Sequence, residues 1–494
     1  MAEGESLRRR ATWVSLGRLS NAAALLLVNV FLARALPDAD VGSFQKVWVL
    51  LTVWVPLFVF GLPLAMSYFG PTLPTAERGR FLAQQVLLSW LSAALFAAAV
   101  LLGAETVARY QGDPHLAVLL RLAVPLGTAL IATGFWEPLL IVYGRHRWLA
   151  VSLAVFSLLH VTAVVLGWLV SGSVRGIYVA LGAYAALRFA VCAAGLVHVA
   201  RPLPLGWRGD WLRQQVRYAL PLGLRDGIGA VSRATDKLIA SFRVSAEQFG
   251  YYVYGALELP LIGLVVDATL AVLLPELAGA HQRGERARVV ELMRLAARRI
   301  GLLVFPVCVL SLVVAEPLMA LLFGGAYRQS APYFRVFALL LLCRVSTSGT
   351  VLMAAGRPGL VLVGSVLDMV LAAGLGLALL PRLGLIGLAV GLLVSTYCQV
   401  AYYLYQAARV LGEPMRRLVP WLDLARLLLV SAAAGAAAAL SARFDAALPN
   451  LAAMGLCFAL VFLGAGYFGR GFGADERAAV RRAARAVGAL AGGR

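Results

Sequence analysis

Long apolar stretches, each about 20 residues and so the length of a transmembrane helix, constrain this sequence more than any other feature. Inside lipid, backbone N–H and C=O groups are satisfied only in helices or in a closed barrel. The strands of a barrel alternate apolar and polar residues over about ten positions, and these stretches do not alternate. We therefore expect an all-α integral membrane protein.

Composition supports this class and excludes a water-soluble enzyme. Of the 494 residues, 61% are hydrophobic and 14% charged, whereas soluble domains carry about 25% charged residues. The cysteines form no CxxC pair and the histidines are scattered, so we expect neither a disulfide framework nor a metal site.

The apolar stretches predict about fourteen transmembrane helices joined by short connections. Their ranges are 11–34, 42–69, 80–103, 117–143, 148–170, 176–199, 212–242, 249–277, 295–315, 331–354, 358–380, 384–408, 420–441 and 449–469.

The net charge of +20 is explained by where the arginines fall between these spans. With the N-terminus inside, most loop arginines lie on the inner side, and the outer loops hold only Arg109, Arg175, Arg243, Arg328, Arg382 and Arg443. Because positive residues concentrate in cytoplasmic loops, both termini are predicted to be cytoplasmic. The basic charge then requires no nucleic-acid partner.

Two weak internal matches indicate a repeat. Residues 31–47 align with 240–255, which pairs Gly42 with Gly250, and 143–153 align with 355–365. Both halves begin inside, so we expect two parallel-repeat six-helix halves, residues 1–205 and 206–410. Two extra helices and a basic cytoplasmic tail make up residues 411–494.

The predicted span 212–242 carries five ionisable residues within an arc of about 120° on the helical wheel. They are Arg225, Asp226, Arg233, Asp236 and Lys237. Charges in lipid are costly and normally face a bundle interior or a wet cavity. We interpret this charged stripe as the wall of a cavity, and the alternative is a set of ion pairs that locks helix packing, most simply for Asp236 and Lys237.

The first span repeats the pattern more mildly, and its polar arc contains Ser15, Arg18, Asn21 and Asn29. Two related polar helices indicate a central cavity between the halves. Arginines in such a cavity favour an anion, and guanidinium matches phosphate in bidentate geometry, so we expect an amphiphile with an anionic head. Two spans contain helix-breaking residues at similar places: Pro56, Gly61 and Pro63 in one, and Pro260, Gly263 and Pro275 in the other. They indicate either helices that bend to open and close a site, or the ordinary tolerance of glycine and proline in lipid.

Energy coupling to H⁺ or Na⁺ is expected to involve carboxylates, without another cofactor. Asp267 and Asp368 lie in mid-span with no cation within one helical turn, so burial is expected to dominate their behaviour. We nominate Asp267 first and Asp368 second as ion carriers, or alternatively as partners of Arg335 or Arg344. Asp226 lies next to Arg225 and is expected to remain ionised as its structural partner.

Residues 221–255, 273–281 and 353–391 resemble O-antigen-type polysaccharide flippases. That superfamily, the multidrug/oligosaccharidyl-lipid/polysaccharide (MOP) exporters, also includes multidrug-and-toxin-extrusion (MATE) transporters and the lipid II flippase. The resemblance implies a MATE-like V-shaped fold and alternating-access transfer of a polyprenyl-diphosphate-linked oligosaccharide across the bacterial inner membrane. It also implies substrate-binding cations at Arg18, Arg225, Arg233 and Lys237, and we add Asn21 and Asn29 of the first span. Many such flippases have twelve helices, so fourteen leaves the subfamily open.

Besides lipid-linked oligosaccharide and membrane lipid, the expected partners are a polysaccharide polymerase and glycosyltransferases. Three alternatives remain: an ion-coupled multidrug exporter, a lipid II-type flippase, and a membrane glycosyltransferase or polymerase. An exporter favours a net acidic cavity, whereas the stripes here are basic. An enzyme would use Asp38 and Asp40 as catalytic acids, but PDADVG also fits a plain turn, and the outer loops are too short to hold an acceptor. We therefore expect no catalytic residues.

Overall fold

The computed structural model describes residues 2–199, 208–257, 259–442 and 447–468. Helices make up nearly all of this part of the chain, and no strand occurs in it. The chain divides into two compact units, Met1–Val253 and Tyr254–Arg494. The expected all-α membrane architecture is confirmed.

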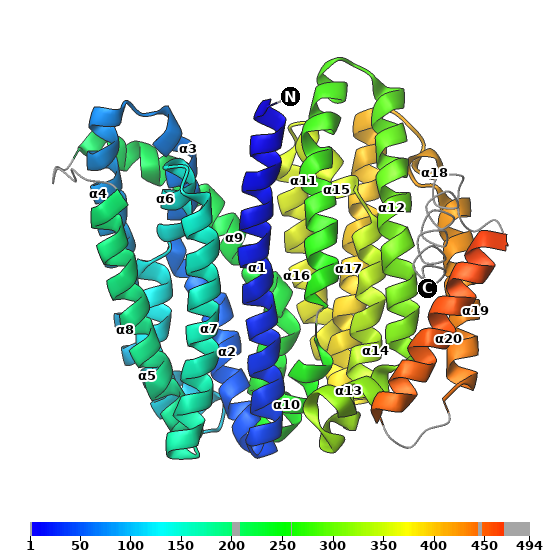
Figure 1. The fold of residues 1–494 in the computed structure, drawn as a ribbon, viewed down its shortest axis with the longest axis horizontal. Helices are drawn as coiled ribbons and strands as arrows, with labels where there is room; N and C mark the ends of the chain where they lie inside the picture. The colour runs from blue at the N-terminus through cyan, green and yellow to red at the C-terminus, as the bar shows by residue number, and fades with distance from the viewer. Residues whose placement is uncertain (1, 200–207, 258, 443–446, 469–494) are drawn as a thin grey trace, which may run out of the picture. The chain divides into compact units, whose positions relative to one another are not determined.

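The first unit consists of helices, most of them of membrane-spanning length (Figure 1). They are α1 (Ala2–Ala35), α2 (Asp38–Val59), α3 (Leu62–Thr72), α4 (Thr75–Tyr110), α5 (His115–Ala132), α6 (Trp136–Val142), α7 (His146–Ser171), α8 (Val174–Val199), α9 (Gly209–Arg243) and most of α10 (Ala246–Gly255). Helix α7 packs between α1 and α8, and α5 packs between α4 and α8.

A break between α2 and α3 separates one predicted span into two helices. Phe60 and Gly61 adopt left-handed backbone conformations, with φ of 50° and 68°. A side chain at Gly61 is excluded because a Cβ there would lie 2.4 Å from the carbonyl oxygen of Ala219. The break therefore lets α9 approach the backbone of α2 and α3 directly, and the expected breaker at Gly61 coincides with a real interruption.

The second unit continues with helices of mixed length. They are α11 (Pro260–Gln282), α12 (Arg286–Val313), α13 (Ala315–Phe323), η1 (Gly325–Ser330), α14 (Ala331–Leu339), η2 (Leu340–Val345), α15 (Ser348–Ala354), α16 (Pro358–Leu383), α17 (Leu385–Leu411), α18 (Met415–Leu418), α19 (Trp421–Leu440) and α20 (Ala447–Phe468). Here the chain breaks between α10 and α11, whereas Gly263 and Pro275 lie inside the continuous helix α11.

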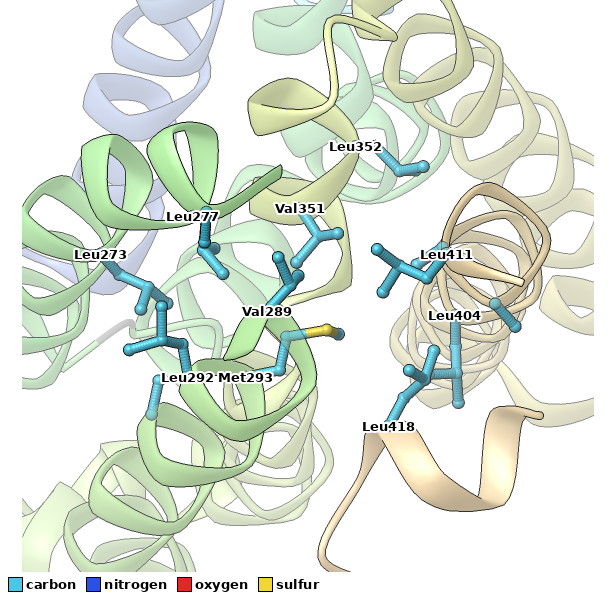
Figure 2. Close-up of a cluster of buried hydrophobic side chains, with 14 residues drawn as sticks. Leu273, Leu277, Val289, Leu292, Met293, Val351, Leu352, Leu404, Leu411 and Leu418 are labelled. Carbon is cyan, nitrogen blue, oxygen red and sulfur yellow. The ribbon is translucent and has the colours of Figure 1, made fainter. Parts of the chain in front are cut away.

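A buried apolar cluster joins five helices of this unit (Figure 2). Leu277 of α11, Val289 of α12, Leu352 of α15, Leu411 of α17 and Leu418 of α18 are each at most 1% exposed. Because apolar burial stabilises by about 25 cal/mol per Å², this cluster fixes α11, α12 and α17 around the short helix α15.

In the described ranges, twelve stretches are long and apolar enough to cross a membrane. They correspond to twelve of the fourteen predicted spans. The other two are α9, whose charged stripe lowers its apolarity, and α10 with α11, so about fourteen spans fit the structure.

The boundary between the compact units at residue 253 differs from the repeat boundary expected at residue 205. The cause is α9, which packs against α2, α3 and α4 of the preceding segment. The two sequence halves remain a prediction.

Candidate functional site

Helix α9 carries the charged stripe, and a face of small residues runs beside the stripe. Ala219, Gly223 and Gly227 lie on this face, and a Cβ at Gly227 would lie 2.6 Å from Leu57 Cδ2. Because Cβ atoms are absent at these glycines, α9 lies close against α2 and α3.

The first two charges of the stripe form an ion pair with each other. Arg225 donates from Nε and Nη2 to Asp226 Oδ1, at 3.2 and 2.9 Å. The two side chains are 48% and 44% exposed. Asp226 thus contacts Arg225 directly, and the pair contributes no net charge at this level of the helix.

Of the last two charges of the stripe, Asp236 is buried and Lys237 is partly buried. Asp236, whose side chain is 1% exposed, accepts a 2.8 Å hydrogen bond from Tyr252 of α10 and lies 3.9 Å from Lys237 Nζ. The Lys237 side chain is 18% exposed. The hydrogen bond from Tyr252 joins α9 to α10. This is the alternative that the sequence left open for Asp236 and Lys237, namely contacts that lock helix packing.

Arg233 differs from the other cations of the stripe. It is exposed, and no carboxylate of a described residue lies within ion-pair distance of it. Its guanidinium lies against Gly229, where a Cβ would stand 3.2 Å from Nη1. Among the residues that the structure describes, Arg233 therefore has no counter-charge.

On α1, Arg18 forms an ion pair with Glu137 of α6, with 2.6 Å between Nη2 and Oε1. The side chains are 58% and 35% exposed. Nothing in the sequence pairs these two residues, because the contact depends on how α1 and α6 pack on α7.

The two asparagines of α1 have different surroundings. Asn29 accepts from Gln45 at 2.8 Å and donates to the carbonyl of Leu25, so its amide joins α1 to α2. Asn21 is exposed and accepts a long 3.5 Å hydrogen bond from Ser157 of α7. Of the two, Asn21 is the one accessible to a ligand.

The two nominated ion carriers lie in the second unit and differ in burial. Asp368 on α16 is 8% exposed and accepts from Ser395 at 2.8 Å and from Thr396 at 3.3 Å, both on α17. Asp267 on α11 is exposed, so the expectation that it is buried is wrong. Arg335 forms an ion pair with Glu316 at 2.8 Å, and therefore is not the partner of Asp368 that the sequence suggested.

The described residues hold no group of three or more His, Cys, Asp and Glu that could bind a metal ion. Three contacts of the site were not predicted from the sequence: that of Glu137 with Arg18, that of Tyr252 with Asp236, and those of two hydroxyls with Asp368. Each is a contact between helices, and helical periodicity carries no information on such contacts.

Two solved structures share this fold. A lipid II flippase MurJ in an inward closed conformation aligns with a TM-score of 0.76 at 14% identity, covering 91% of this chain and 97% of that one. An inward-facing multidrug resistance MATE family transporter of the MOP superfamily aligns with a TM-score of 0.65, also at 14% identity, covering 82% and 99%. The chain therefore has the multi-pass helical fold that these two membrane proteins share.

Sequence comparisons give the family. A probable lipid II flippase MurJ from Rhizobium meliloti (strain 1021) is 27% identical over 229 residues, which are 42% of this chain and 43% of that relative's length. The family model of the lipid II flippase MurJ matches residues 66–456. The chain belongs to the lipid II flippase MurJ family.

Membership corrects one expectation and confirms two. The superfamily is the expected one, but the O-antigen-type subfamily is wrong, because the matching family is that of lipid II flippases. The expectation of a transporter rather than an enzyme agrees with the family to which the chain belongs, which is one of flippases.

Proposed function

We propose that this protein is a flippase that moves a polyprenyl-diphosphate-linked saccharide of the lipid II type across the bacterial inner membrane by alternating access. Its product would supply peptidoglycan synthesis rather than lipopolysaccharide synthesis. The family match supports the substrate class, and the uncompensated charge of Arg233 is the observation within the molecule that carries the proposal.

The chemistry of the cations fits a diphosphate head. Guanidinium presents up to five N–H donors in a planar fork that matches phosphate oxygens, and such charge-assisted hydrogen bonds are the strong ones. Arg18, Arg225 and Arg233 are all exposed. Arg233 acts in this proposal as the principal anion-binding group, and Arg18 and Arg225 as cations already balanced by carboxylates.

Coupling to an ion gradient is part of the same proposal. Moving one charge across 100 mV is worth about 2.3 kcal/mol, which is enough to bias the transfer of an anionic head. The buried carboxylate of Asp368, with two hydroxyl donors beside it, suits an H⁺ or Na⁺ carrier better than the exposed Asp267. Polymerases and glycosyltransferases that consume the translocated saccharide are the proposed partners.

Replacement of a resident flippase tests the function. In a bacterium depleted of its own lipid II flippase, the wild-type chain is expected to restore growth, and Arg233→Ala to fail at equal membrane abundance. Arg233→Lys should restore growth partly, because it keeps the charge and loses the fork. Export of a multidrug-transporter dye without restored growth would instead indicate the drug-exporter alternative and overturn the proposal.

A further inference from the structure

The ion pair between Arg18 and Glu137 is held from both sides by close packing on α7. On α1, Gly17 precedes Arg18, and a Cβ at Gly17 would lie 3.2 Å from Ala150 Cα and 3.0 Å from Leu153 Cδ1. The contact therefore leaves little room between α1 and α7. It fixes the backbone from which the Arg18 side chain extends.

Glu137 is fixed in a similar way by the residue that precedes it. The indole of Trp136 donates to Ser152 Oγ of α7 at 3.0 Å. Its ring lies over Gly195 of α8, where a Cβ would lie 2.4 Å from Cη2. Since α7 contacts both Gly17 and Trp136, the separation of Arg18 and Glu137 is set by the scaffold rather than by two free surface side chains.

The pair leaves part of the guanidinium available. Only Nη2 of Arg18 donates to Glu137, and the remaining donors bond to no other residue in the described part of the chain. With 58% of its side chain exposed, Arg18 can donate from Nε and Nη1 to a phosphate while Nη2 stays on the carboxylate.

We propose that Glu137 is a positioning and specificity-determining residue, which orients Arg18 and restricts it to anions of more than one negative charge; this rests on the proposed function. A phosphodiester with a single charge, such as a phospholipid head, meets a pair that is already neutral. A diphosphate diester carries two charges and more acceptor oxygens, so it retains a net attraction to the guanidinium beside Glu137. The pair thereby discriminates the substrate head from the bulk anionic lipid of the membrane.

The test measures how tightly the purified full-length protein in detergent binds two probes, a polyprenyl diphosphate and phosphatidylglycerol. In Glu137→Gln, Arg18 has no counter-charge, so both probes should bind more tightly and phosphatidylglycerol should gain more. We expect the dissociation constant for phosphatidylglycerol, divided by that for the diphosphate, to fall by about tenfold. This fall corresponds to a loss of about 1.4 kcal/mol of discrimination. Glu137→Asp, which keeps the charge, should retain most of the ratio.

The matched control is Glu105→Gln. Glu105 forms an ion pair of the same kind with Arg121 in the same unit, at 2.7 Å and with side chains 67% and 45% exposed. Removing this charge should leave the ratio unchanged. In an Arg18→Ala background, Glu137→Gln should also have no effect, because the residue acts through Arg18.

Two failures are distinguishable. If the wild-type protein binds the diphosphate but Glu137→Gln leaves the ratio unchanged, the specificity role is wrong and the proposed function stands. If the wild type does not prefer the diphosphate at all, both are overturned. Should Glu137→Gln aggregate on size-exclusion chromatography, Arg18→Ala carries the test alone, and an unchanged ratio there refutes the proposal.

Discussion

Gly42 on α2 and Ala246 on α10 meet backbone to backbone, so closely that a Cβ on Gly42 would lie 1.6 Å from the carbonyl oxygen of Ala246. Gly250 lies on the same contact, where its Cβ would be 3.5 Å from Gly42 N. The internal sequence alignment pairs Gly42 with Gly250, and the structure places these two residues side by side. Around them, Lys46 donates to the carbonyl of Val244 at 3.4 Å, and Tyr251 donates to Asp38 at 2.6 Å.

Gly42→Ala is expected to destabilise the protein, because the methyl group meets backbone that cannot move aside without separating α2 from α10. Overpacking of this kind typically costs about 1–3 kcal/mol. Thermal unfolding of the purified protein should therefore start at a lower temperature. Gly103→Ala in α4 is the matched control, since nothing lies within 4 Å of its Cβ position, and an equal Tm for the two variants would contradict the prediction.

The fold could be predicted from the sequence largely because apolar run length is a strong signal. All fourteen predicted spans correspond to single helices or to consecutive helical segments, including 42–69, which the structure divides at Gly61. Within 249–277, the interruption lies just before Pro260, one of the three predicted breakers, whereas Gly263 and Pro275 lie inside helix α11. A glycine or proline inside lipid is compatible with a continuous helix.

The candidate site was predictable only in part. Periodicity placed Arg225, Asp226, Arg233, Asp236 and Lys237 on one arc, but it could not say which are buried. That depends on α10, whose Tyr252 covers Asp236, and on which charges find partners. Asp267 lies in mid-span, which predicts burial, but its side chain lies on an exposed part of α11.

Tyr252→Phe tests the buried end of the stripe. It removes the hydrogen bond to Asp236 and leaves a buried carboxylate oxygen without that donor, which typically costs about 1–3 kcal/mol. The expected result is a lower Tm. Tyr251→Phe removes a hydrogen bond to Asp38, which is partly exposed and can bind water instead, so its Tm should fall less. The reverse order would show that Asp236 does not depend on Tyr252.

Asp368→Asn is expected to abolish the dependence of transport on an imposed pH or sodium gradient, because the amide cannot exchange a proton or supply a charged ligand. The measurement is transfer of a fluorescent lipid-linked saccharide in proteoliposomes with and without the gradient. Asp267→Asn is the comparison, and its gradient dependence should persist because the residue is exposed. Retained dependence in Asp368→Asn would exclude this carboxylate as the carrier.

The topology prediction concerns connections that end helices at glycines. Single cysteines at Gly284 and Gly412 should be protected in intact cells from an impermeant thiol reagent, and those at Gly112 and Gly172 should react. The positive-inside distribution of arginines is the physical reason. All four positions have a left-handed backbone with φ between 60° and 73°, which a cysteine rarely adopts, so each cysteine variant must be checked for membrane insertion. The opposite labelling pattern would place both termini outside.

Gly229→Ala separates a binding role of Arg233 from a structural one. The added methyl group would lie 3.2 Å from Arg233 Nη1, which is the end of a flexible side chain and can shift cheaply. Alanine also favours the helix over glycine by about 0.5–1 kcal/mol, so stability should hold or rise. Displacing the uncompensated guanidinium should nevertheless weaken binding of a polyprenyl diphosphate, by about tenfold if one charge-assisted hydrogen bond is lost. Gly279→Ala is the matched control, because the methyl group added there would also lie 3.2 Å from an arginine, Arg283 Nη1, and Arg283 already pairs with Glu285. If both variants bind the diphosphate as tightly as the wild type, the position of the Arg233 guanidinium against Gly229 does not matter for binding, and the prediction is wrong.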